Sequence, residues 1–593
     1  MANSIFLGLG CWQRQSAGCL SLIIPLLLVT CAGQAVVGDD ISVWAAGCTE
    51  KIQDQKRSAL PHDVVWDAAT KTVRLEAVRG EHVPFQIVIS TDQRHLNGIQ
   101  LSPARFVSEE NEIDQANINL FLLPLVNVYA ATQDHGSSGR WPDAMVPLVE
   151  PFDMQFYWHS QKINQQSVWV DIWVPVEQPA GTYRASIDIS AGSAQLDRIK
   201  VEMVVHDICL PQQRNFPVHI GLYENQIARV HGVDQDSLAF KQIFAGYLNY
   251  LLDNRCDPRT SPGFRGQTKN GDYVLQTNSP HLEKLFLEKG RLQFWISPVP
   301  EGVTRPGQVP FPDAYQNSVR RHLQQVIQHA KKSGWYSKLG FHVPVDEPKS
   351  ADDYAAVREW AKLIKSVDEN VPVAVTEQPK PENSQWGSLA EHVDSWIING
   401  NYLFTDRESI EQRREKGDQV FWYVSCDQLY PQPNLYIDRA AADPRMIPWI
   451  AWQYQLSGFL YWNATYWGEV LNPWRDPVTW KTLPCNLPAS GEGSLFYPGN
   501  MVKQFSGQPN VEGPVGSLRL QLLREGLEER ELLQMLARKI GRNEVEKIIS
   551  PVCTDIRTFS RDPNQVDKVR KQVIQKLLDI QRTESTKKVG KHP

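Results

Sequence analysis

The second half of the sequence alternates short apolar runs with long amphipathic segments, and this rhythm constrains the fold more than any other feature. Eight apolar runs from Phe216 onward are candidate strands: residues 219–222, 254–256, 292–296, 339–345, 371–375, 393–398, 419–424 and 458–462. Helical patterns lie between them, including residues 313–333, 351–366 and 439–454. Strands that alternate with helices form parallel sheets covered by helices. The sequence therefore predicts a (β/α)8 TIM-like barrel over residues 215–500, with 254–256 as its weakest strand.

The N-terminal part has a different pattern. Residues 73–77, 84–89, 167–174 and 183–189 alternate apolar with polar side chains and have no helical segments between them. This pattern predicts an antiparallel β-sandwich over residues 40–210. At the other end of the chain, residues 517–540 and 563–582 have apolar positions at helical spacing, which predicts a C-terminal helical segment, 501–593, packed on the barrel. The fold class expected is multidomain, β followed by α/β.

The first 35 residues resemble an export signal. Arg14 precedes an apolar run at residues 20–29, which is too short to span a bilayer. Residues 28–31 resemble a lipobox that would leave Cys31 lipid-anchored, whereas residues 33–35 suit ordinary cleavage, and both endings stay open. We expect an exported protein, periplasmic, cell-surface or secreted, with no transmembrane helix in the mature chain.

Composition excludes some partners. A net charge of −6 and the lack of a long basic run argue against nucleic acid binding. Six cysteines follow the signal region without CxxC spacing, so no metal site is expected, although one or two disulfides are possible. The 19 tryptophans suit either large cores or sites that stack on sugars. Nothing indicates a cofactor or an oligomeric state.

The fourth predicted strand ends in two adjacent carboxylates, Asp346 and Glu347, followed by Pro348. Barrel active sites lie where strands end, and strand alternation directs Asp346 toward the barrel axis and Val345 toward the helices. A bend before Pro348 can bring Glu347 over the mouth as well. On the same face, His342 is interpreted as a hydrogen-bonded interior histidine rather than a proton shuttle.

Adjacent carboxylates suit glycoside hydrolysis in which the substrate's own 2-acetamido group is the nucleophile. Glu347 would protonate the leaving oxygen. Asp346 would orient the acetamido group and stabilise it as it closes to an oxazolinium. Retaining enzymes that use a protein nucleophile usually take the two carboxylates from different strands.

The chain resembles glycoside hydrolase family 123, whose characterised members are β-N-acetylgalactosaminidases. The resemblance rests on residues 141–143, 179–183, 345–348, 421–424, 447–452, 458–462 and 518–528. It implies that the family's stabilising Asp and acid/base Glu fall on Asp346 and Glu347. It also implies a retaining, exo-acting β-N-acetylhexosaminidase that favours N-acetylgalactosamine on a glycan or glycoconjugate.

Side chains at the other strand ends are candidates for sugar binding, because aromatic rings bury the apolar face of a pyranose and polar groups bind its hydroxyls. They are Trp295, Glu377, Trp396, Asn399, Tyr423, Asp427, Tyr461, Trp462, Asn463 and Trp467.

Two alternatives stay open. In the first, Asp427 is a direct nucleophile on sugars that lack an acetamido group, with Glu347 as acid/base. In the second, the chain is a surface glycan-binding protein without catalysis, since one fold hosts many functions. The sandwich is expected to brace the barrel.

Overall fold

The structure is a computed structural model that describes residues 41–589, except 56, 60–62, 93–95, 133–134, 155–162, 260–263, 270–271, 278–279, 301–302, 469–471 and 481–487. The predicted signal segment with Cys31 lies outside the described residues, as does Cys485. No disulfide joins any two of the five cysteines that are described. In the described part, none of the helices is long and apolar enough to cross a membrane.

The N-terminal domain is a sandwich of two sheets, as predicted. The five-stranded sheet has the order β1 (Ile41–Gly47), β4 (Glu81–Thr91), β12 (Gln165–Val174), β8 (Ile118–Leu122), β11 (Val146–Pro147). The second sheet has the order β2 (Trp66–Asp67), β3 (Thr72–Arg79), β14 (Ala194–Cys209), β13 (Gly181–Ala191), β6 (Phe106–Val107), β7 (Glu112–Ile113), with β5 (Ile99–Pro103) also on β13. Apolar side chains from both sheets form one core. The pair β3–β14 is parallel, so the sandwich is not purely antiparallel as predicted.

The second domain contains one eight-stranded parallel sheet. Its order is β16 (Asp257–Pro258), β15 (Val218–Ile220), β24 (Gly458–Tyr461), β23 (Gln419–Tyr423), β22 (Ser395–Asn399), β21 (Val373–Thr376), β20 (Leu339–Asp346), β19 (Phe294–Ile296). The first and last strands in sequence, β15 and β24, are neighbours, as in a barrel. Seven of the eight predicted strands overlap these elements; the exception is 254–256, because the strand lies at Asp257–Pro258 instead.

The sheet curls upon itself. The ring of Trp295 on β19 lies 5.8 Å from that of Phe421 on β23 and 6.2 Å from that of His219 on β15. Between the end strands β16 and β19, the described residues show a side-chain bridge in place of a strand ladder, since the N–H of Leu292 donates to Asp257 at 3.4 Å. Complete closure into a (β/α)8 barrel therefore stays a prediction.

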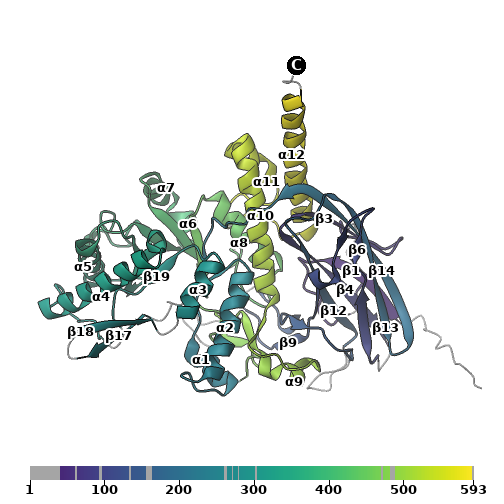
Figure 1. Cartoon of the computed structure of the whole chain (residues 1–593), viewed down its shortest axis with the longest axis horizontal. Coiled ribbons are helices and arrows are strands. Elements are labelled where there is room, and N and C mark those ends of the chain that lie inside the picture. Colours follow the sequence, from purple (N-terminus) through teal and green to yellow (C-terminus); the bar gives the residue numbers. More distant parts are fainter. Residues whose placement is uncertain are drawn as a thin grey trace, which may run out of the picture.

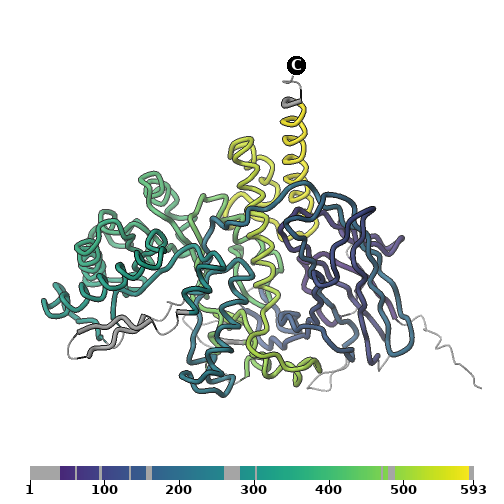
Figure 2. Tube along the Cα trace, viewed as in Figure 1, coloured from purple at the N-terminus to yellow at the C-terminus, as the bar shows by residue number. Residues whose placement is uncertain are grey.

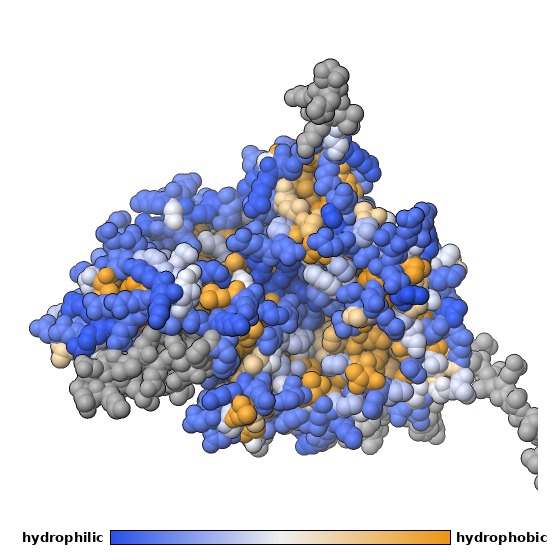
Figure 3. Space-filling view, viewed as in Figure 1, coloured by the Kyte–Doolittle hydropathy of each residue, from blue (hydrophilic) through white to orange (hydrophobic). Residues whose placement is uncertain are grey.

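Helices cover the outer face of this sheet, and their apolar faces share one core with it (Figure 1). They are α1 (Glu224–His231), α2 (Leu238–Asp253), α3 (Pro280–Glu288), α4 (Asp313–Lys332), α5 (Ala351–Val367), α6 (Gly400–Thr405), α7 (Arg407–Glu415) and α8 (Ala442–Gln453). A hairpin, β17 (Phe264–Lys269) with β18 (Asp272–Thr277), projects beside α4. On the side of the molecule drawn in Figure 3, hydrophilic residues dominate over the α/β domain and an apolar patch lies over the sandwich.

Helix α10 (Leu518–Ile540) lies between the two domains (Figures 1 and 2). Its Arg519 forms a two-pronged ion pair with Asp143 of the sandwich, both N–O distances being 2.8 Å, and its Arg524 pairs with Asp171 on β12 at 2.9 and 3.0 Å. The two arginines therefore join the C-terminal helices to the sandwich. Charge-paired guanidinium groups can be buried at an interface where unpaired ones cannot.

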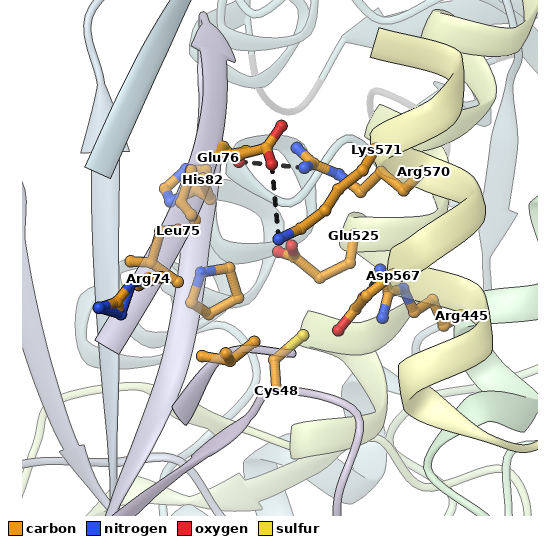
Figure 4. A pocket seen from close by; sticks show the side chains of 13 residues that line it. Cys48, Arg74, Leu75, Glu76, His82, Arg445, Glu525, Asp567, Arg570 and Lys571 are labelled. Atoms are coloured by element: carbon orange, nitrogen blue, oxygen red, sulfur yellow. Dashed lines mark hydrogen bonds and ion pairs between the residues drawn. The ribbon is translucent and has the colours of Figure 1, made fainter. Parts of the chain in front are cut away.

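The remaining C-terminal helices are α11 (Arg542–Ile549) and α12 (Pro563–Val589), and α12 continues the contact with the sandwich. Arg570 of α12 bonds to Glu81 at 2.6 Å. A small interdomain cavity of about 60 Å³ lies beside this pair. Figure 4 shows Glu76 and His82 of the sandwich facing Arg570 and Lys571 of α12 across it. The interface is therefore polar as well as apolar.

Candidate active site

The end of β20 places Asp346 and Glu347 differently. Along the strand, Phe341, Val343 and Val345 are buried against the helices, and Asp346 is exposed on the opposite face, as alternation predicts. At Glu347 the backbone has φ 45°, the left-handed region that residues other than glycine rarely adopt. The chain thus turns sharply before Pro348, and such strained residues are concentrated at functional sites.

The carboxyl group of Glu347 has two donors. The hydroxyl of Tyr423, at the end of β23, donates to Oε1, and the ammonium of Lys349 donates to Oε2 at 3.0 Å. Burial, with the negative charge of Glu347, raises the pKa of Tyr423 well above its ordinary value. The tyrosine therefore keeps its proton and stays a donor.

A polar pocket of about 150 Å³ opens beside Glu347. The ends of four neighbouring strands, β20 to β23, and the loops that follow them supply its lining. The lining residues are Glu347, Pro348, Lys349, Thr376, Glu377, Gln378, Glu382, Asn399, Asn401, Tyr402, Tyr423 and Asp427. Four of the residues predicted to bind sugar are thus brought together with Glu347: Glu377, Asn399, Tyr423 and Asp427.

The carboxyl group of Glu377 differs from that of Glu347 in being buried. It is 6 % exposed and accepts a hydrogen bond from the hydroxyl of Tyr354 at 3.1 Å. Burial raises the pKa of Glu377 to about 8, and the negative charges of Glu382 and Glu347 add to this shift. At neutral pH the group is protonated, so it can donate a hydrogen bond into the pocket.

Asp427 is held by amide groups. Its Oδ2 accepts from Nδ2 of Asn399 and from Nδ2 of Asn401, both at 3.0 Å, and Ser425 donates to Oδ1. Asn399 also donates to the Tyr423 hydroxyl at 3.2 Å. One hydrogen-bond network therefore links Asp427, through Asn399 and Tyr423, to Glu347.

Asp346 is not among the residues that line the polar pocket, and it lies near Arg259. Burial lowers the pKa of Arg259, and the negative charge of Asp346 opposes that shift. The guanidinium also contacts Nδ1 of His342 at 3.1 Å, while Nε2 of His342 lies 3.0 Å from the Thr376 hydroxyl. Because arginine only donates, Nδ1 accepts and Nε2 carries the proton. Burial and the charge of Arg259 lower the pKa of His342, so this histidine is neutral with both nitrogens bonded, in agreement with its interpretation as an interior residue.

Aromatic rings gather where β24 and β15 end. The half-buried Trp462 lies 5.1 Å from Tyr466 and 6.4 Å from Tyr223, measured between ring centroids, and Tyr223 is 42 % exposed. These rings offer apolar surface at the mouth, on which the face of a pyranose can stack.

Three predicted sugar contacts are corrected by the structure. Trp396, Tyr461 and Trp467 are each 0 % exposed and belong to the core between sheet and helices. Trp396 has the opposite strand parity to Asn399, and its indole N–H donates to Asp418 at 2.7 Å. Trp467 donates instead to the carbonyl of Phe496 at 3.1 Å.

Two further candidates also lie below the surface. Trp295 is 5 % exposed and fills the interior of the curled sheet beside Phe421. Asn463 is 1 % exposed, and its Oδ1 accepts the N–H of Thr465 at 2.7 Å, which fixes the turn after β24. Both positions indicate packing rather than contact with a sugar.

Several residues of the site were not predicted from the sequence. Asn401 lies two residues past the end of β22, and Lys349 lies two residues past Glu347, so the strand-end rule could have found both. Tyr223 follows β15 by the same rule. Arg259 was hidden because its strand, β16, is only two residues long.

Comparison with known proteins identifies the class. Residues 307–536 match the model of the glycoside hydrolase 123 catalytic domain, and residues 57–191 match that of the glycoside hydrolase 123 N-terminal domain. The protein is a glycoside hydrolase. More narrowly, the chain belongs to glycoside hydrolase family 123.

A solved structure of the same family agrees with the fold. A family 123 glycoside hydrolase from Clostridium perfringens, described in a study of glycolipid glycan hydrolysis, superposes with a TM-score of 0.68 at 16 % identity, covering 92 % of this chain and 100 % of that one. A family 39 glycoside hydrolase from Bacteroides cellulosilyticus gives a TM-score of 0.32 at 11 % identity, covering 72 % of this chain and 80 % of that one. Among the curated proteins compared, none matches the sequence.

Proposed function

We propose that this glycosidase is a retaining, exo-acting β-N-acetylhexosaminidase that favours N-acetylgalactosamine and uses the substrate's acetamido group as nucleophile. The observation that carries the proposal is the turn at Glu347, whose φ of 45° breaks the alternation of the strand and so allows two adjacent carboxyl groups to face the same mouth. Glu347 lines the polar pocket, and Asp346 lies near Arg259. The similarity to a hydrolase of glycolipid glycans supports a glycoconjugate substrate.

In the first step, Glu347 acts as the general acid and gives a proton to the glycosidic oxygen while the acetamido carbonyl oxygen attacks C1 and the C1–O bond breaks. Asp346 accepts the acetamido N–H and stabilises the positive charge of the oxazolinium. In the second step, the Glu347 carboxylate takes a proton from water, and the oxygen of that water attacks C1 and reopens the ring. Two inversions at C1 give net retention.

The hydrogen bonds that the Asp427 carboxylate accepts favour this mechanism over direct attack by Asp427. A nucleophilic carboxylate must present one oxygen to C1, but Oδ2 of Asp427 carries two amide donors and Oδ1 carries a hydroxyl donor. We assign Asp427 to the support of Asn399 and Tyr423.

The test is hydrolysis of paired aryl β-glycosides: the N-acetylgalactosaminide, the N-acetylglucosaminide and the plain galactoside, each with and without a thiazoline that mimics the oxazolinium. Cleavage confined to the acetamido sugars and blocked by thiazoline is expected. In Glu347→Gln, turnover of substrates with poor leaving groups should fall by about 10³-fold or more. Asp346→Asn should slow all acetamido substrates, and Asp427→Asn should cost only about tenfold.

Other outcomes would change the assignment. Rapid cleavage of the plain galactoside, with a covalent glycosyl-enzyme that is lost in Asp427→Asn, would make Asp427 the nucleophile. Binding of glycans without turnover of any of them would contradict the proposed activity.

We further propose that the chain is exported, on the strength of the apolar run at residues 20–29. Metabolic labelling with a palmitate analogue in a bacterial host distinguishes lipidation at Cys31 from ordinary cleavage of the signal. Label that is lost in Cys31→Ala would show a lipid anchor, and an unlabelled, shortened protein would show ordinary cleavage.

A further inference from the structure

The ring of Trp462 is fixed by a turn that lies thirty residues later in the chain. The indole N–H of Trp462 donates to Oε1 of Glu492 at 2.6 Å. Tyr461, next to Trp462, receives the N–H of Gly493 on its hydroxyl at 2.9 Å and also bonds to Glu492. Both the edge of the indole and the strand that carries it are therefore tied to residues 492 and 493.

Gly493 also shapes the space beneath the indole. Its φ is +65°, and a Cβ added there would overlap the six-membered ring of Trp462. A side chain at this position would thus both strain the backbone and displace the ring. Glycine is required here for the ring to lie against the turn.

The turn itself is held by the interdomain ion pair. Arg519 donates to the carbonyl oxygens of Gly491 and Ser494 at 2.9 and 2.7 Å, and it also donates to the Leu435 carbonyl and to Asp143 of the sandwich. The N–H of Ser490 donates to the Thr132 hydroxyl of the sandwich at 2.9 Å. The sandwich and α10 together fix the turn on which Glu492 and Gly493 sit.

From this geometry we propose that Glu492 and Gly493 are positioning residues, which hold Trp462 as the aromatic platform for the sugar at the mouth. The inference rests on the proposed function, since the platform requires a sugar substrate. Glu492 is 1 % exposed, so it acts through the indole and not by contact with the sugar. This positioning role also gives the sandwich a part in catalysis, because Arg519 joins the sandwich to the turn that carries Glu492.

Glutamine is a matched control at position 492. Burial raises the pKa of Glu492 to about 8, so the carboxyl is neutral at pH 7, and glutamine keeps the shape, the neutrality and an oxygen for the indole N–H. Alanine removes the acceptor. Trp462→Phe removes the indole N–H but keeps a ring.

The experiment combines kinetics with ¹⁹F spectra of the protein labelled with 5-fluorotryptophan, in which the Trp462 resonance is assigned by its loss in Trp462→Phe. We expect Glu492→Ala to shift or broaden that resonance and to raise KM about fivefold to tenfold with little change in kcat. Glu492→Gln should leave both readouts unchanged within about twofold. In the Trp462→Phe background, Glu492→Ala should add less than about twofold, because the two residues act as one unit.

An unchanged Trp462 resonance in Glu492→Ala, or losses that multiply in the double variant, would overturn the proposal. Gly493→Ala gives a second way to displace the ring if Glu492→Ala fails to fold. The spectra need no substrate, so they decide the positioning role even if the wild type hydrolyses none of the acetamido glycosides, an outcome that would defeat only the proposed function.

Discussion

The hydroxyl of Tyr423 donates a hydrogen bond to Glu347 and accepts one from Asn399, whose amide also holds Asp427. The proposed acid is therefore not an isolated side chain at the end of β20. Its orientation depends on a network that begins at the ends of β22 and β23, and catalytic geometry is sensitive to displacements of about 1 Å.

Removing the Tyr423 hydroxyl should impair catalysis more than binding. In Tyr423→Phe, Glu347 loses one of its two donors and can rotate away from the glycosidic oxygen, so kcat should fall about 10- to 100-fold with KM changed less than about threefold. Tyr402→Phe is the matched control, because its hydroxyl lies in the same pocket but donates to Glu382. Steady-state kinetics on an aryl N-acetylgalactosaminide check both, and equal losses in the two variants would contradict a specific role for Tyr423.

The ionisation of Glu377 predicts a pH effect. Its pKa rises from an ordinary 4.5 to about 8 in the folded protein, so the folded state holds this proton where the unfolded state has lost it. The stability that this group contributes is thus complete below about pH 4.5 and is lost as pH rises toward and through about 8. Glu377→Gln does not titrate, and melting temperatures of the two proteins should diverge in favour of the variant between pH 5 and 9.

The pH dependence of activity should also reflect the ionisation of Glu377. Above pH 8, ionised Glu377 adds a negative charge to a pocket that already holds Glu347 and Glu382. We expect an alkaline limb in the wild-type pH–rate profile that is weakened in Glu377→Gln, with rates at pH 6 within about threefold of each other. Superimposable profiles would mean that Glu377 does not titrate in this range.

Seven of the eight strands, and the strand ends that line the polar pocket, could be predicted from the sequence, because burial and alternation act over a few neighbouring residues. Trp396 and Asn399 lie three residues apart on β22, so their side chains point to opposite faces of the sheet, and the predicted sugar contact of Trp396 could have been avoided. The burial of Trp467 could not be predicted in this way, because Trp467 lies outside any strand or helix and no alternation of side chains indicates which residues are buried there. Glu492 could not be predicted, because its partner Trp462 is brought to it only by the packing of α10 and the sandwich.

The correction at Trp396 can be tested against Trp462. Trp396→Phe removes a buried hydrogen bond to Asp418 and part of a packed ring, so it should lower stability by about 1–3 kcal/mol and leave KM unchanged. Trp462→Phe should do the reverse, raising KM with a smaller effect on unfolding by urea. An increase in KM for Trp396→Phe at full stability would restore its predicted contact with the sugar.

Breaking the buried pair between Arg519 and Asp143 should cost more stability than breaking an exposed ion pair. The two side chains are 1 % and 0 % exposed, and Asp143→Ala leaves a buried guanidinium without its carboxylate, which costs about 3–5 kcal/mol. Asp188→Ala is the control, because it breaks a pair with Arg198 whose side chains are 40 % and 55 % exposed, and such solvent-exposed pairs contribute little to stability. Urea unfolding followed by circular dichroism should show a large drop in the midpoint for the first variant alone. Because Arg519 also holds the turn with Glu492, Asp143→Ala should broaden the fluorotryptophan resonance of Trp462 under conditions where the protein is still folded, and a sharp, unshifted resonance would limit the sandwich to a role in stability.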